Sequence, residues 1–270
     1  MIFNDEFFKS YSSKLFDAKF SRQLVGSIEK TSGIDWDNLD IFESEDAAYK
    51  IQEYVAARNL QHGLKIVGRK IGLTSKVIQK KFNFSSPISG FIFDNDVFGT
   101  NNTFDLRYWE NPSIEGEIAV VLKRDLNNER NTIVDIINAI DYVLPAIEIV
   151  DSRYEGGAQG IYDIITDNSS NAGVILGASP VRLFDADLEN CKMNMMCDGD
   201  IVSSGFGRDC LGHPLNALVW LANFMVEREN PLKSGEFIIT GALGPAVKVE
   251  AGKKFTVSLD GIGGVSANFE

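Results

Sequence analysis

Residues 113–121 read SIEGEIAVV, which is the sharpest local feature of the sequence. Its apolar part favours a β-strand over Glu117–Lys123. Glu115 and Glu117 stand two positions apart at the start of this run, and alternate side chains of a strand point to the same face. Two like charges that close repel each other unless a cation lies between them. Taken alone, such a pair is more often two solvated glutamates at an exposed strand edge.

A second apolar run adds a third acid to this pattern. Residues 143–150 read VLPAIEIV, which is typical of a buried strand except for Glu148. An acid inside so hydrophobic a strand needs a partner, because a buried unpaired charge is costly. Either Arg153, which follows shortly, neutralises Glu148, or the three carboxylates bind a hard divalent cation such as Mg²⁺ or Mn²⁺. Spacing alone does not favour either explanation.

Residues 68–75, GRKIGLTS, are the next candidate for ligand binding. Glycines on both sides of Lys70 allow a ligand to approach the backbone closely. A lysine there could bind a substrate carboxylate or transfer a proton, although a solvated lysine at a strand end is the commoner case. The spacing of this segment is not that of a phosphate-binding P-loop.

Two further polar segments are less specific. Residues 166–173, TDNSSNAG, offer hydroxyl and amide groups that could orient a ligand, but these residue types also favour ordinary turns. His213 stands beside Pro214, and a histidine near a helix start is more often structural than catalytic. No Ser-His-Asp or Cys-His arrangement can be argued from the sequence.

The first 64 residues are predicted to be helical. Apolar residues recur there at helical spacing, namely Phe7, Tyr11, Leu15 and Phe16. Ser44 is expected to cap a second helix, whose first turn carries acids, and Lys30–Asp40 is expected to be a loop.

From about residue 65, short β-rich runs alternate with glycine-rich turns. Besides the two runs above, strands are expected at Gly173–Leu176, Phe237–Thr240 and Phe255–Leu259. Helices are expected at Thr132–Tyr142 and at Pro214–Glu227, which has Pro at its first position. The predicted fold class is therefore α+β, with a helical N-terminal region (1–64) on a larger domain with a mixed sheet (65–270).

Composition excludes several classes of protein. Lys plus Arg number 26 and Asp plus Glu number 38, so the net charge of −12 disfavours nucleic acid and acidic membranes as partners. Three cysteines without a Cys-x-x-Cys pair, and two histidines, disfavour both a disulfide framework and a zinc site. The first residues are acidic rather than basic, and the longest apolar stretch, Leu215–Val226, is too short for a membrane span. We expect a cytoplasmic protein.

Several segments together resemble one family. In chain order they are GRKIGLTS, PSIEGEIAVVL, YVLPAIEIVDSRY, TDNSSNAGVILG, LGHPLNALVWLAN and LKSGEFIITGAL, followed by GIGGVSANF. From about residue 44 onward, this order is similar to that of the 2-keto-4-pentenoate hydratases (2-hydroxypenta-2,4-dienoate hydratases) in the fumarylacetoacetate hydrolase superfamily. Several motifs in the right order are far more specific than any one of them.

The resemblance implies a fold and a set of site residues. The fold is a mixed β-sheet roll of the fumarylacetoacetate hydrolase type with a helical N-terminal region. Carried over by motif, the ligands of Mg²⁺ or Mn²⁺ are Glu115, Glu117 and Glu148, the catalytic residue is Lys70, and the substrate-binding residues are Gly72, Ser169 and Thr240. Ser169 comes from the A-D-N-x-S motif, which reads TDNSS here.

The resemblance also implies an activity. The enzyme is expected to be a metal-dependent hydro-lyase that adds water to 2-hydroxypenta-2,4-dienoate, or to a related 2-oxo acid, to give a 4-hydroxy-2-oxo acid in the catabolism of aromatic compounds. Members assemble as homo-oligomers, and a complex with a downstream aldolase or a related pathway enzyme is a further expectation.

Three alternatives stay open. The 2-oxo-3-hexenedioate (4-oxalocrotonate) decarboxylases come second, because Ile88 replaces the acid of the hydratase pattern Q-P-D-[FY]-G, whereas residues 210–217, CLGHPLNA, resemble hydratases. A hydrolase or tautomerase of the same superfamily is the next alternative, although a true carbon–carbon hydrolase would need a base, and His62 has no motif around it. A non-catalytic, metal-binding partner subunit is the third alternative.

Overall fold

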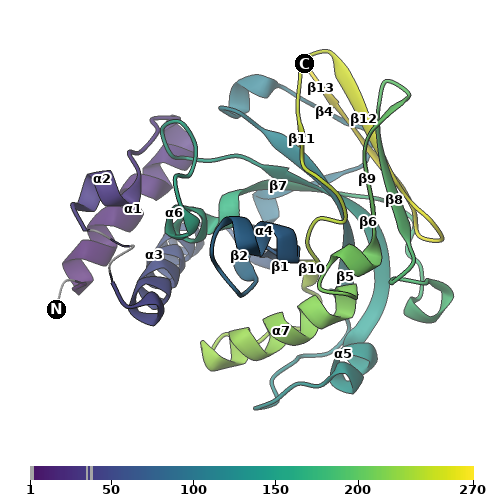
Figure 1. The fold of residues 1–270 in the computed structure, drawn as a ribbon, viewed down its shortest axis with the longest axis horizontal. Coiled ribbons are helices and arrows are strands. Elements are labelled where there is room, and N and C mark those ends of the chain that lie inside the picture. Colours follow the sequence, from purple (N-terminus) through teal and green to yellow (C-terminus); the bar gives the residue numbers. More distant parts are fainter. Residues whose placement is uncertain (1–2, 35, 37–38) are drawn as a thin grey trace.

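The computed structural model describes residues 3–34, 36 and 39–270. Its helices are α1 (Asp5–Ser21), α2 (Ile28–Ser32), α3 (Ile41–Gln61), α4 (Lys76–Lys81), α5 (Ile133–Ala139), α6 (Ile161–Thr166) and α7 (Pro214–Glu227). The N-terminal helices lie beside α6 at one end of the molecule, and the sheets form the other end (Figure 1).

The strands form two sheets. The larger sheet has the order β2 (Ile88–Phe93), β1 (Ile66–Gly72), β10 (Phe237–Ile239), β5 (Ser113–Leu122), β6 (Ile140–Val150), β7 (Asn171–Leu176) and β3 (Val97–Gly99), with β11 (Val247–Lys248) also paired to β5. The smaller sheet has the order β4 (Asn102–Phe104), β13 (Gly263–Phe269), β12 (Lys253–Leu259), β8 (Lys192–Cys197) and β9 (Asp200–Phe206). Both parallel and antiparallel pairs occur, so the α+β class with a mixed sheet is confirmed.

The short strand β10 joins two antiparallel pairs into one sheet. It runs parallel to β1 and antiparallel to β5. Ile239 lies opposite Lys70 on one side and opposite Ala119 on the other. The residues that follow Ile239 therefore lie close to both β1 and the start of β5.

Strand β5 separates the core from the acidic face. Ile114 and Ile118 are fully buried in the main hydrophobic core, together with Met193 and Val257 of the smaller sheet. A Cβ on Gly116, between them, would lie 3.0 Å from the sulfur of Met193, so the sheets pack closely there. Because side chains alternate along a strand, the odd-numbered residues of this stretch point to the opposite face.

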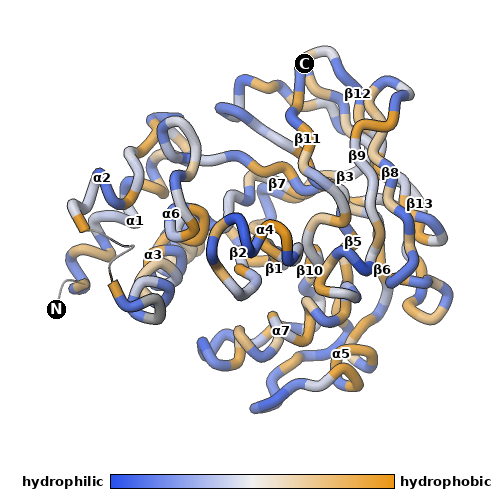
Figure 2. Tube along the Cα trace, viewed as in Figure 1, coloured by the Kyte–Doolittle hydropathy of each residue, from blue (hydrophilic) through white to orange (hydrophobic). Residues whose placement is uncertain are grey.

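The loop that leads into α5 is largely hydrophilic (Figure 2).

The N-terminal helices have a second hydrophobic core. α1 and α3 pack against each other, and α3 packs against α6. Leu15, Ile51 and Ile165, one from each of these helices, are buried in this core. The hydroxyl of Tyr11 donates a hydrogen bond to that of Tyr154 over 3.2 Å, which ties α1 to the segment between β6 and α6. The division at residue 64 stays a prediction.

Most of the predicted elements are present, and three predictions need correction. Ser44 does not cap α3, because the helix begins at Ile41 behind Asp40, whose side chain accepts from the Glu43 amide at 3.4 Å. Residues 30–32 belong to α2 rather than to a loop, and residues 35, 37 and 38 of that predicted loop lie outside the described residues. The helix expected over Thr132–Tyr142 ends at Ala139, since its β-branched and aromatic end belongs to β6.

Within the described residues, none of the helices combines the length and apolar character that a membrane span requires.

Candidate metal and active site

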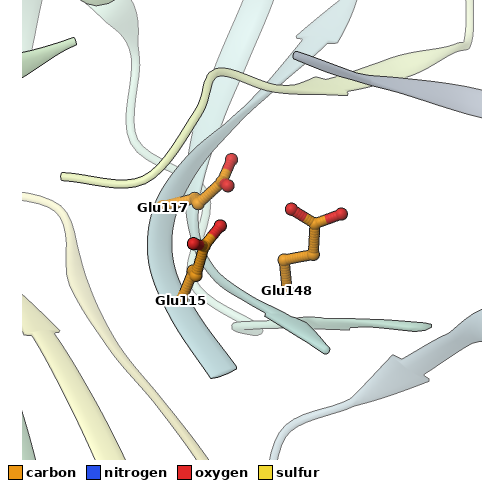
Figure 3. A group of neighbouring side chains, drawn as sticks. All are labelled: Glu115, Glu117 and Glu148. Carbon is orange, nitrogen blue, oxygen red and sulfur yellow. The ribbon is translucent and has the colours of Figure 1, made fainter. Parts of the chain in front are cut away.

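Three glutamates converge where β5 and β6 pair. Glu115 lies directly opposite Glu148 in the antiparallel register, and Glu117 lies two residues further along the same face. One carboxylate oxygen from each lies within 4.8 Å of the other two (Figure 3). The side chains of Glu117 and Glu148 are fully buried, so these two are not the solvated strand-edge residues that an isolated E-x-E pattern suggests.

Each buried carboxylate is held by one amide donor. The backbone N–H of Gly241, just after β10, donates to Glu117 Oε2 over 2.7 Å. The side-chain amide of Asn171 donates to Glu148 Oε1 over 2.8 Å. The second oxygens, Glu117 Oε1 and Glu148 Oε2, are buried and have no hydrogen-bond partner among the described residues. Two unpartnered buried carboxylate oxygens beside a third acid fit a hard divalent cation.

Lys70 on β1 is the cation of this cluster. Its Nζ lies 3.2 Å from Glu148 Oε1 and donates to the backbone carbonyl of Ser169 over 2.8 Å. Arg153, the alternative partner considered for Glu148, instead bonds to Asp167 and to the carbonyl of Asn171. The structure therefore pairs Glu148 with Lys70.

The charges of the cluster shift the ionisation of its members. Burial alone would lower the pKa of Lys70, but the nearby carboxylates, Glu148 above all, raise it above its ordinary value. Burial and the charge of Glu148 raise the pKa of Glu115 to about 7, although Lys70 lowers it. For the same reasons the pKa of Glu117 lies well above its ordinary value. Burial and mutual repulsion thus favour the protonated forms of Glu115 and Glu117.

The predicted substrate-binding residues lie around Lys70 and Glu117. A Cβ on Gly72 would lie 3.1 Å from the side chain of Ile88 and 3.4 Å from Lys70 Nζ, so a larger residue there would crowd the ammonium. Thr240 is fully buried, its N–H donates to the carbonyl of Ile118, and its hydroxyl has no partner among the residues that the structure describes.

Ser169 is also buried, but its hydroxyl donates to the carbonyl of Ser89 over 2.6 Å. It is the backbone carbonyl of Ser169 that faces Lys70. The last letter of the A-D-N-x-S motif corresponds by position to Ser170, which is half-buried, so the motif leaves two serines as candidates for substrate contact.

Neither histidine takes part in the cluster. His213 precedes α7, and its Nδ1 accepts a hydrogen bond from the Leu215 amide over 3.1 Å, which is an N-cap. His62 lies at the exposed end of α3, where its ring packs 4.6 Å from that of Phe16. His213 thus has a structural contact in the fold, and His62 lies outside the acidic cluster.

Sequence reasoning missed two groups of the site. Asn171 lies within the TDNSSNAG segment, which was singled out as a whole but without assigning this residue to Glu148. Gly241 contributes only a backbone amide and takes φ +108°, a conformation that favours glycine. A single glycine in a turn gives no signal that its amide reaches an acid more than 120 residues away.

Comparison with known proteins identifies the family. The profile described as "Fumarylacetoacetate (FAA) hydrolase C-terminal" matches residues 79–270. The chain belongs to this family.

Relatives of this fumarylacetoacetate hydrolase family protein include two kinds of enzyme. A 2-keto-4-pentenoate hydratase of Paraburkholderia phymatum is 40% identical over 268 residues, which cover 98% of each chain. 2-Keto-4-pentenoate hydratase 1 of Dechloromonas aromatica is 45% identical over 225 residues, or 83% of this chain and 86% of that one. A 4-oxalocrotonate decarboxylase of Pseudomonas putida is 39% identical over 82% of this chain and 84% of its own.

A solved structure shares the fold along the whole chain. The 4-oxalocrotonate decarboxylase from Pseudomonas putida G7, complexed with magnesium and adipate, matches with a TM-score of 0.91 at 32% identity and covers 99% of both chains. The expected fold of the fumarylacetoacetate hydrolase type is therefore confirmed.

Proposed function

We propose that this protein is a metal-dependent hydratase that adds water to 2-hydroxypenta-2,4-dienoate, or to a related 2-oxo acid, giving a 4-hydroxy-2-oxo acid. The observation that carries the proposal is the cluster of Glu115 with the buried Glu117 and Glu148 beside Lys70, in a chain that aligns end to end with a named hydratase.

The cofactor proposed for the trio is Mg²⁺ or Mn²⁺, held by Glu115, Glu117 and Glu148. All-oxygen ligands suit these ions, and two structures of the Pseudomonas decarboxylase hold magnesium or calcium. Bound there, the ion would supply Lewis-acid polarisation of the oxygens of a 2-oxo acid. The amides of Gly241 and Asn171 fix the two buried carboxylates before any ligand arrives.

Lys70 is proposed as the proton carrier. Its Nζ is buried, is held between Glu148 and the Ser169 carbonyl, and lies 3.4 Å from the position of a Cβ on Gly72. The free hydroxyl of Thr240 is proposed to bind a substrate oxygen, together with Gly72 and Ser169. A positioned acid or base of this kind contributes roughly 10²–10⁴-fold in rate.

The second candidate is 2-oxo-3-hexenedioate (4-oxalocrotonate) decarboxylase. It is favoured by Ile88, which is buried on β2 opposite Gly72 and offers no acid beside the site. The match to the Pseudomonas decarboxylase along the whole chain agrees with this alternative.

The two candidates are separated by an assay with both substrates in Mg²⁺ or Mn²⁺. The dienol absorbance and the release of CO₂ are followed for 2-hydroxypenta-2,4-dienoate and for 2-oxo-3-hexenedioate. Loss of the dienol without CO₂, abolished by Glu117→Gln but not by Glu129→Gln at an exposed position, is the expected result. Release of CO₂ from the diacid would support the decarboxylase function in place of the hydratase function. Absence of turnover with either substrate would contradict both proposed functions.

We further propose a cytoplasmic homo-oligomer that acts in the catabolism of aromatic compounds, with a downstream aldolase or related enzyme as a pathway partner. Residues 1–64 are proposed as its helical region and residues 65–270 as its catalytic domain.

A further inference from the structure

The carbonyl that faces Lys70 belongs to a turn of unusual backbone. Asn168, Ser169 and Ser170 form a single 3₁₀ turn in which all three residues take positive φ, at 53°, 53° and 59°. The left-handed region costs a residue with a side chain about 1–2 kcal/mol, and Asn pays least. Such strain persists only where surrounding contacts determine the conformation, and it gathers at functional sites.

The side chain of Asn168 provides the anchor of this turn. Its Oδ1 accepts from the backbone N–H of Phe91 over 2.7 Å, and its Nδ2 donates to the carbonyl of the same residue over 2.8 Å. Phe91 lies on β2, an end strand of the larger sheet, so this one side chain satisfies both backbone groups on the open edge as a neighbouring strand would.

The anchored turn meets Lys70 from across β2. Gly90 pairs with Lys70 in the register of β1 and β2, and a Cβ there would lie 2.6 Å from the Asn168 carbonyl oxygen and 3.0 Å from Lys70 Cγ. The absence of a side chain at residue 90 therefore lets the turn lie close to the lysine. The next carbonyl, that of Ser169, accepts from Lys70 Nζ.

We propose that Asn168 is a positioning residue: by bonding both backbone groups of Phe91, it holds the left-handed turn so that the Ser169 carbonyl fixes the Lys70 ammonium beside Glu148. Asn168 touches neither the three glutamates nor the reacting atoms and acts through Lys70. The inference rests on the proposed role of Lys70 in turnover.

The structure offers a matched control. Asn223 on α7 makes the same pair of bonds to Asn131: its Oδ1 accepts from the Asn131 N–H at 2.7 Å and its Nδ2 donates to the Asn131 carbonyl at 3.0 Å. Its other bond goes to the Val219 carbonyl on its own helix, so none of its bonds reaches the site.

The experiment compares Asn168→Ala, Asn168→Gly and Asn223→Ala in the metal-loaded enzyme. The two alanine variants are expected to lose similar thermal stability, but only Asn168→Ala should lose kcat, by about 10–100-fold, with KM and the Kd for Mn²⁺ within about twofold of wild type. Asn168→Gly, which allows positive φ without strain, should keep the low kcat because the bonds to Phe91 are still missing. If Asn168→Ala does not fold, the kcat of Asn168→Gly provides the same test.

Three results would overturn the inference: an unchanged kcat in Asn168→Ala, an equal loss of kcat in Asn223→Ala, or recovery of kcat in Asn168→Gly, which would assign the effect to backbone conformation. Each variant is compared with wild type on whichever of the two substrates wild type converts. Failure of the proposed function appears instead as wild-type inactivity on 2-hydroxypenta-2,4-dienoate.

Discussion

At the scale of single residues, burial and the charge of Lys70 have opposite effects on the pKa values of the site's glutamates. Three carboxylates share a buried space with one lysine, and burial raises the pKa of Glu115 and Glu117 while Lys70 opposes that shift. The lysine is therefore both a structural counter-ion and the proposed proton carrier. The two roles can be separated by measurement.

Replacing Lys70 by Ala should lower kcat by about 10²–10⁴-fold in the presence of Mg²⁺, while circular dichroism remains that of a folded protein. The physical reason is loss of the one buried ammonium of the cluster. Lys254→Ala, at an exposed position on β12, should keep wild-type turnover. A kcat close to that of wild type in Lys70→Ala would contradict the proposed role of Lys70 as the proton carrier.

The ionisation of Glu115 makes stability depend on pH. Its pKa is about 7 in the metal-free fold and about 4.5 when unfolded, so the folded state binds the proton more tightly. This contribution is fully present below about pH 4.5 and is lost as the pH rises through about 7. The unfolding free energy of the metal-free protein should fall less steeply with pH in Glu115→Gln than in wild type. Urea denaturation in EDTA from pH 5 to 8 measures this, and equal slopes in the two proteins would contradict it.

Bound metal should oppose the fall in the unfolding free energy of the wild-type protein as the pH rises. Divalent ions bind ionised carboxylates, so the stabilisation by Mg²⁺ should grow from pH 5 to pH 8. Thermal unfolding at a series of Mg²⁺ concentrations tests this. A stabilisation that does not change with pH would argue against ligation by Glu115 and Glu117.

At the scale of elements, single groups at the ends of helices and strands complete the site and the fold. The turn after β10 supplies the amide of Gly241 to Glu117, and His213 supplies the acceptor that begins α7. The first contribution comes from a backbone amide, and the second from the neutral imidazole ring of His213. Both can be removed without changing the acidic cluster itself.

Gly241→Ala should weaken metal binding by about 10–100-fold, the usual effect of losing a group that orients a ligand. A Cβ there would lie 2.5 Å from Thr74 Oγ1, which would force the turn and its N–H away from Glu117. Gly235→Ala is the matched control, since Gly235 also takes positive φ, at +88°, but has open space around it. Calorimetric titration with Mn²⁺ gives both affinities, and equal losses would show that φ alone is responsible.

His213→Ala should lower the unfolding free energy by about 1 kcal/mol, the ordinary value of an N-cap, while His213→Asn should retain most of it. Burial lowers the pKa of His213, so the fold favours the neutral ring whose Nδ1 accepts from Leu215. This contribution is therefore present above about pH 6.5 and is lost as the pH falls below it. Urea denaturation at pH 7.5 and 5.5 checks both statements, and a loss of kcat in His213→Asn would instead favour a catalytic histidine.

At the scale of the whole molecule, the sequence indicates which glutamates form the site better than it indicates the long-range contacts around them. Glu148 in an apolar run, and Glu115 and Glu117 at the start of a strand, have a local signal because an unpaired buried charge is costly. The pairing of β10 with β1 has no such local signal. It places Lys70 opposite Ile239, and the sequence around either residue does not indicate that the two strands pair. The same holds for Asn168 and Phe91, 77 positions apart, whose contact depends on the turn's left-handed backbone.

The central position of β10 has a consequence for synthesis of the chain. The β1–β2 and β5–β6 pairs are each local and can form as soon as their own residues have left the ribosome. They cannot join until Phe237–Ile239 emerges and inserts between them. Until then, each pair presents an open strand edge, which is prone to pairing with another chain. Both edges therefore stay uncovered until Phe237–Ile239 has been made, and only then can Lys70 of the first pair meet the carboxylates of the second.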